Sequence, residues 1–126
     1  MPITYTVDNE RNVVWVTWQG DVAGEDYRAH LRTMLEDPDA LRVGRSLTDL
    51  RQANILLSGA ELDAIGQAEA VPRLVGRKWK TAVLVNSPHS YGLARQYEML
   101  SESEATDRVF FDYAAALDWL LSDAPT

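Results

Sequence analysis

The sequence predicts an α/β domain built on a mixed, mostly parallel sheet. Three observations predict it: two strand-like segments open the chain, strand and helix patterns then alternate, and residues 82–85 form a continuous apolar run. Such a run is typical of a strand covered by helices on both faces. The resulting order, β-β-α-β-α-β-α-β-α, favours parallel strands joined by right-handed crossovers. The 126 residues, 46% of them hydrophobic, are enough for one domain.

Two strands open the chain. Residues 3–8 alternate apolar and polar side chains, as a half-exposed strand does. Residues 9–12 have turn composition. Residues 13–18 are apolar on nearly both faces, so they are expected to form a central strand that pairs back on the first. Residues 19–21 are expected to end it.

An amphipathic helix is expected next, over residues 24–37, because its apolar side chains recur at helical spacing. Residues 37–39, with a proline between two aspartates, are expected to stop it. His30 falls on the polar side of this helix, so we expect it to face solvent. Residues 45–50 form a short predicted strand, and residues 51–57 a loop.

The second half of the chain continues the alternation. In order, its elements are a helix over residues 59–71 capped by Ser58, a strand over residues 79–86, a helix from Ser87 to about residue 102, a strand over residues 108–111, and a helix from Asp112 to Leu121. The first of these helices is expected to bury Leu62, Ile65 and Ala68, and the last to turn Tyr113 inward. Residues 122–126 are expected to be a frayed tail. The sequence has no internal repeat and no linker, so we expect the whole chain, 1–126, to form one domain.

Composition excludes several classes of function. The chain has no cysteine, which excludes disulfides, thiolate metal sites and thiol catalysis. Its 12 basic and 19 acidic residues give a net charge of −7 without a long basic stripe, so we expect no nucleic-acid partner. No apolar run approaches the ~20 residues of a membrane span, and the start lacks a signal-peptide pattern. The expected location is the cytoplasm.

The sequence also offers no catalytic arrangement. The spacing of Ser87, His89 and Ser90 does not supply a nucleophile, a base and an orienting group, and no Gly-x-Ser-x-Gly motif occurs. No pair of carboxylates has a spacing that indicates acid–base or metal chemistry, and two histidines are too few for a His-rich metal site. We therefore expect neither an enzyme nor a cofactor or metal.

Candidate binding residues come from the loops beyond the carboxyl ends of the strands, where ligands of open parallel sheets bind. These loops are residues 19–24, 49–58, 86–91 and 111–113. The candidates in or next to them are Asp49, Arg51, Ser58, Ser87, Tyr91 and Arg95.

For several candidates two roles are open. Asp49 and Arg51 either orient a partner or a polar ligand, or have a structural role, in which they pair with each other or cap the helix that follows Ser58. Ser58 either meets an anion or phosphate at a helix N-terminus, or is an ordinary cap. Tyr91 and Arg95 lie one helical turn apart and form either a binding patch for a carboxylate, phosphate or protein, or, through Arg95 and Glu98, a surface ion pair. Ser87 or Ser90 is expected to cap the helix that follows.

Four segments carry a resemblance to a known family. They read VVWVTWQGDVAGEDYRAHL, SLTDLRQANILLSGAELDAI, YGLARQYEML and RVFFDYAAALDWL. In this order they resemble the SpoIIAA-like, STAS-type domain of anti-sigma-factor antagonists, and the small bacterial proteins grouped as STAS/Sec14-like. The resemblance implies a sheet of about five strands with an antiparallel first strand, and a regulatory or binding role.

The resemblance also implies where regulation would act. In the antagonist branch a serine is phosphorylated in an Asp-Ser-Ser-Gly-like stretch that opens the helix after the third strand. Here that stretch reads ILLSG, with Leu57 in place of the aspartate, Ser58 at the first serine and Gly59 at the second. The Sec14-like side of the resemblance implies an apolar ligand.

These observations lead to one expectation and one alternative. We expect a non-enzymatic STAS/SpoIIAA-like regulatory or protein–protein interaction domain, whose partner is another protein or, in a homodimer, a second copy of the chain. The alternative is a carrier or sensor of a small apolar or anionic ligand. A cavity of a few hundred Å³ is what this alternative predicts.

Overall fold

The computed structural model describes residues 1–100 and 105–122, with side chains described for residues 1–95 and 106–122. The elements are β1 (Ile3–Asp8), β2 (Val13–Val22), α1 (Gly24–Leu35), α2 (Pro38–Val43), β3 (Arg45–Ile55), α3 (Gly59–Glu69), the 3-10 turn η1 (Pro72–Leu74), β4 (Trp79–Leu84), α4 (Pro88–Leu100), β5 (Ala105–Phe110) and α5 (Tyr113–Leu121). Residues 123–126 of the predicted tail and the predicted helical residues 101–102 lie outside the described ranges.

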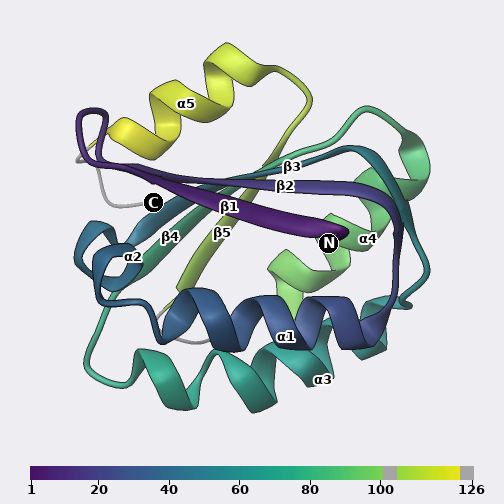
Figure 1. The fold of residues 1–126 in the computed structure, drawn as a ribbon. Helices are drawn as coiled ribbons and strands as arrows, with labels where there is room; N and C mark the ends of the chain where they lie inside the picture. Colours follow the sequence, from purple (N-terminus) through teal and green to yellow (C-terminus); the bar gives the residue numbers. More distant parts are fainter. Residues whose placement is uncertain (101–104, 123–126) are drawn as a thin grey trace.

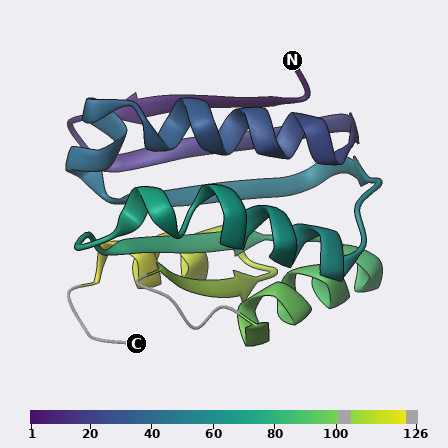
Figure 2. The ribbon, with the colours of Figure 1, turned by 90° about the horizontal axis from the view of Figure 1, so that it is seen from below.

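The predicted α/β architecture is confirmed. Five strands form one sheet in the order β1-β2-β3-β4-β5. β1 is antiparallel to β2, and every later neighbouring pair is parallel. Figure 1 shows α1 and α3 below the sheet and α5 above it, and Figure 2 shows α1 and α3 side by side across the lower face. α4 contacts α3 and β5 on that same face.

Two apolar clusters hold the layers together. The larger lies between the sheet and α1, α3 and α4, and includes Val14, Trp18 and Leu31. The smaller lies under α5 and includes Leu84 and Leu120, both fully buried. Alternation along a strand explains the division, because successive side chains point to opposite faces.

The central strands are longer than the sequence predicts. β3 continues to Ile55 and β2 to Val22, whereas residues 51–57 were predicted as a loop and residues 19–21 as the end of a strand. Beyond a bulge near Thr17, these two segments pair with each other. Each therefore supplies hydrogen-bond partners for the backbone N–H and C=O groups of the other. β5 likewise begins earlier than predicted, at Ala105.

A short helix that the sequence analysis did not predict, α2, follows α1. The stop signal at residues 37–39 is also a start signal, because the Asp37 side chain accepts a hydrogen bond from the backbone N–H of Asp39. Pro38 occupies the first helical turn, where a missing N–H has no cost. Gly44 then ends α2 with φ of +69°, a left-handed conformation that favours glycine.

On α1 and α3, two predicted exposures are wrong. His30, expected to face solvent, is buried between α1 and the sheet, with its ring edge-to-face against Tyr5 at 6.0 Å between centroids. On α3, Ala68 is exposed, and its neighbour Glu69 is buried instead. In both cases a polar side chain occupies a position facing the sheet or the neighbouring helix.

Candidate functional site

Asp49 and Arg51 lie at the carboxyl edge of the parallel strands. Asp49 pairs in register with Leu84, the last residue of β4, although β3 itself continues past it. Two hydrogen bonds of 3.0 Å join the Arg51 guanidinium to the two carboxylate oxygens of Asp49. Burial raises the pKa of Asp49, but the hydrogen bonds and charge of Arg51 outweigh it, so the net shift is downward. The two candidates therefore pair with each other.

Ser87 holds the first turn of α4 at the same edge. Its hydroxyl accepts the backbone N–H of Ser90 at 3.1 Å and lies 2.8 Å from the Ser90 hydroxyl. The side-chain amide of the preceding Asn86 donates to the backbone oxygen of Arg51 at 3.3 Å. Ser87 thus has the capping geometry that its spacing predicts, and the loop after β4 is tied to β3.

Three exposed aromatic side chains follow the carboxyl ends of β4 and β5, and we call them the edge aromatic patch: Tyr91 at 38% exposure, Phe111 at 57% and Tyr113 at 40%. The rings of Tyr91 and Phe111 stack with centroids 5.2 Å apart. Tyr113 stacks on the half-buried Trp15 at 6.4 Å. Tyr113 was predicted to point inward, and this is wrong. It is the first residue of α5, and its exposed ring lies over Trp15.

Arg51 borders the edge aromatic patch. The pKa of Arg51 is raised first by its hydrogen bonds to Asp49, and also by its electrostatic interaction with Tyr113. Arg95 lies one turn beyond Tyr91 on α4 and is half-buried. The side chain of Glu98, the expected partner of Arg95, lies outside the described side chains. The edge thus combines aromatic rings with guanidinium groups.

Ser58 caps α3. Its hydroxyl accepts the backbone N–H of Glu61 at 3.1 Å, and the Glu61 carboxylate accepts the backbone N–H of Ser58 at 3.0 Å. This reciprocal pair is a capping box, which satisfies two backbone donors that the helix leaves open. The hydroxyl remains exposed to solvent.

Replacing Ser58 by alanine is expected to lower the free energy of unfolding by about 1 kcal/mol, because the N–H of Glu61 loses its acceptor. Ser58→Asp is the matched control, since a carboxylate also accepts this hydrogen bond. Urea unfolding of the three proteins measures the difference. Equal stability of the alanine variant and the parent would contradict the capping role.

A cluster of charges that the sequence analysis did not single out lies at the end of α3. The Glu69 carboxylate accepts hydrogen bonds from Arg28 at 2.9 Å, from Arg32 at 3.0 and 2.9 Å, and from Arg73 at 3.1 Å. Hydrogen bonds from Arg32 and then Arg28 lower the pKa of Glu69 to about 2. The cluster joins α1 to α3 and the turn after it, which indicates a structural role.

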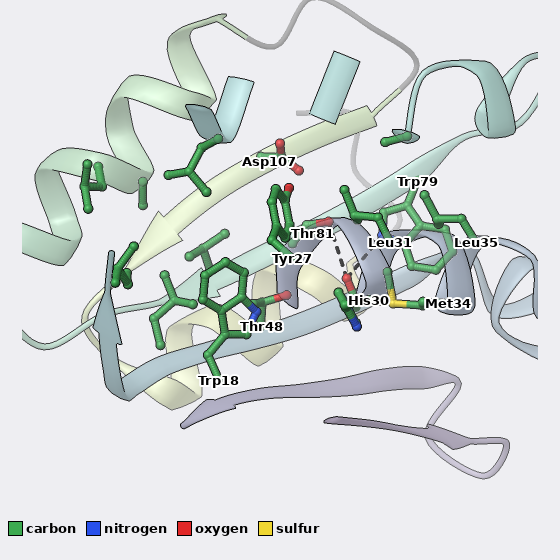
Figure 3. A pocket seen from close by; sticks show the side chains of 18 of the residues that line it. Trp18, Tyr27, His30, Leu31, Met34, Leu35, Thr48, Trp79, Thr81 and Asp107 are labelled. Atoms are coloured by element: carbon green, nitrogen blue, oxygen red, sulfur yellow. Dashed lines mark hydrogen bonds between the residues drawn. The ribbon is translucent and has the colours of Figure 1, made fainter. Parts of the chain in front are cut away.

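A partly open cavity of about 110 Å³ is the second feature that the sequence analysis missed. It lies between β2–β5 and the helices α1, α3 and α4, and its walls are mostly apolar. Figure 3 shows Trp18, Thr48 and Asp107 among the side chains around it. The indole N–H of Trp18 is buried there without a hydrogen-bond partner. Its volume is below the few hundred Å³ that the carrier alternative predicts.

Among the described residues, no group of three or more His, Asp or Glu side chains is placed to hold a metal ion. Within the same part of the chain, no helix has the length and apolar character needed to cross a bilayer.

Comparisons with known proteins bear on the fold. No protein-family model and no curated protein matches the chain. A crystal structure does: an uncharacterised protein of the DUF3478 family with a SpoIIAA-like fold, from Shewanella loihica PV-4. It superposes with a TM-score of 0.63 at 17% sequence identity, over 94% of this chain and 93% of that one. The resemblance stated from the sequence is therefore confirmed for the fold, and this chain has the SpoIIAA-like fold.

Proposed function

We propose that this protein is a non-enzymatic regulatory domain of the cytoplasm that binds a partner protein through the edge aromatic patch. The observation that carries the proposal is the exposure of Tyr91, Phe111 and Tyr113 together at one edge of the sheet. Aromatic side chains of this size are normally buried, and exposed apolar patches mark interaction sites. The position supports the same conclusion, because it is the carboxyl edge of the parallel strands.

The chemistry of the patch fits a protein partner. Tyrosine and arginine are enriched at the centres of protein interfaces, where they supply most of the binding energy. Tyr91 and Phe111 stack and so present one apolar surface, and Arg51, paired with Asp49, interacts electrostatically with Tyr113. A partner would place an apolar side chain on the two rings and polar groups around Arg51.

Phe111→Ser is expected to weaken partner binding at least about tenfold, because it removes the most exposed ring of the patch. Val75→Ser is the matched control: Val75 is 75% exposed and precedes β4, at the opposite edge of the sheet. Chemical cross-linking in the source cells, followed by mass spectrometry, identifies proteins held by the parent and the control but lost by Phe111→Ser. Titration of the identified protein then gives the three affinities.

The outcomes separate clearly. Loss of the partner in Phe111→Ser alone supports the proposal, and a similar effect of Arg95→Ala would extend the binding surface along α4. If the captured protein is a second copy of this chain, sedimentation equilibrium should show a dimer that Phe111→Ser dissociates. The same cross-linked proteins in all variants would contradict the proposal.

A further inference from the structure

We propose that the cavity between the sheet and α1, α3 and α4 is a binding site for a compact, neutral, apolar molecule with one hydrogen-bond acceptor. The cavity is separate from the edge aromatic patch, and none of the three patch residues lines it. The proposal rests on three properties of the cavity: its size, one unpartnered donor and the charges in its wall.

Size limits the ligand to a small molecule. The volume of about 110 Å³ exceeds the roughly 30 Å³ that one water takes in the liquid. It is somewhat smaller than an engineered apolar cavity of about 150 Å³ that binds benzene. A molecule of about six or seven non-hydrogen atoms therefore matches the space.

The hydrogen-bond donor in the wall specifies one feature of that molecule. Trp18 is only 4% exposed, and its indole N–H lies buried without an acceptor. Such a group is costly to leave unpaired, and a ligand oxygen that accepts its hydrogen bond would remove the cost. By contrast, the indole N–H of Trp79, in the same wall, donates to the Ser46 hydroxyl at 3.1 Å. Trp18 is thus distinct from the satisfied tryptophan beside it.

The mostly apolar wall favours a neutral ligand, because a buried charge is costly, and the charged residues in it disfavour an anion in particular. None of the described lining residues is a lysine or arginine, so nothing in this part of the wall compensates an anion. The acidic residue Asp107 lies in the wall and opposes negative charge. His30 also lies in the wall. Burial lowers the pKa of its imidazole to about 4, so it is neutral at pH 7. The anionic ligand of the earlier alternative does not fit this cavity.

Two probes of equal size test the proposal on the purified full chain. Cyclohexanone carries an acceptor oxygen, and methylenecyclohexane replaces that oxygen by a CH₂ group. Titration is followed by the indole N–H resonances in two-dimensional NMR, and Trp18→Phe identifies the Trp18 signal. We expect cyclohexanone to shift this signal downfield. Trp18→Phe should weaken cyclohexanone binding about tenfold and change methylenecyclohexane binding less than twofold.

A filled cavity provides the second test. Ala94, 8% exposed on α4, lines the cavity, and Ala94→Leu should abolish binding of both probes. If Ala94→Leu does not fold, Ala70→Leu replaces it as the filling variant, because Ala70 lines the cavity at the end of α3. An unchanged Trp18 signal, an equal loss of both probes in Trp18→Phe, or binding that survives filling would each overturn the proposal. Phe111→Ser should bind cyclohexanone as the parent does, so failure of the partner proposal leaves this result unaffected.

Discussion

Glu69→Gln is expected to lower the melting temperature by about 10 °C at pH 7, one of the two largest effects predicted for this chain. The Glu69 side chain is 6% exposed and holds three guanidinium groups. Glutamine keeps the volume but accepts at one oxygen only, and its amide group would face a cation. The three guanidinium groups at the junction of α1, α3 and η1 would then lose the buried carboxylate that they share, and among the described residues only the exposed carboxylates of Glu25 and Glu36 would remain beside them.

Glu25→Gln is the matched control. It makes the same change in charge on α1, but Glu25 is 91% exposed and lies 3.9 Å from Arg28. Its melting temperature should stay within about 2 °C of the parent, because exposed ion pairs contribute little. Thermal unfolding followed by circular dichroism measures both variants. Equal melting temperatures for the two glutamine variants would show that the cluster does not hold the helices together.

The pH dependence of Glu69 has a definite sign. Its three arginines lower its pKa from 4.5 to about 2 in the folded protein, with Arg32 the largest cause. The unfolded chain therefore takes up the proton first, so the stabilisation is complete above pH 4.5 and is lost as the pH falls towards 2. Glu69→Gln should be less sensitive to pH across this range than the parent.

The sequence predicts elements well where the signal is local. The order of strands and helices is confirmed, and Ser58 and Asp112 cap the helices that they were predicted to begin. Caps depend on residues within one turn, so sequence spacing determines them. The far ends of β2 and β3 could not be predicted in the same way, because residues 19–21 and 52–54 are polar or small and become strands only by pairing with each other.

Two of the buried polar residues, His30 and Glu69, show a different limit. On α1 the buried positions are Tyr27, His30, Leu31, Met34 and Leu35. Successive buried positions are three, one, three and one residues apart, which is the usual spacing of a helix face that packs against a core. Residue type, not spacing, misled the prediction for His30. Glu69 extends the inner face of α3 in the same manner, and its carboxylate is acceptable there because arginines from α1 and from beyond α3 reach it.

The candidate site was predicted only in part. The convergence of loops at the carboxyl edge placed Asp49 and Arg51 correctly at that edge, and their mutual pairing was one of the alternatives left open. Of the edge aromatic patch only Tyr91 was predicted, because Phe111 was assigned to the last predicted strand, which ends at Phe110, and Tyr113 has the spacing of an inner residue. The cavity depends on how side chains from four strands and three helices fill space, which no local pattern encodes.

His30→Leu is expected to remove a large part of the protein's sensitivity to mild acid. Burial lowers the pKa of His30 from 6.5 to about 4, so between these values the unfolded chain binds a proton that the folded chain does not. Stability is therefore complete above pH 6.5 and falls as the pH decreases to 4. Across that range the parent should lose about 3 kcal/mol more unfolding free energy than His30→Leu. Urea unfolding at pH 7.5, 5.5 and 4.0 measures this difference.

Two features of the chain make this result specific to His30. The aromatic ring against it, Tyr5, stays neutral throughout, since burial and its hydrogen bond to Asp37 raise the pKa of Tyr5 to about 12. Glu69 loses its stabilisation only below pH 4.5, so the two windows barely overlap. His89→Leu, at an exposed position, is the control and should follow the parent. If parent and His30→Leu lose stability in parallel, the imidazole accepts its proton inside the folded protein, and the space around it must admit water.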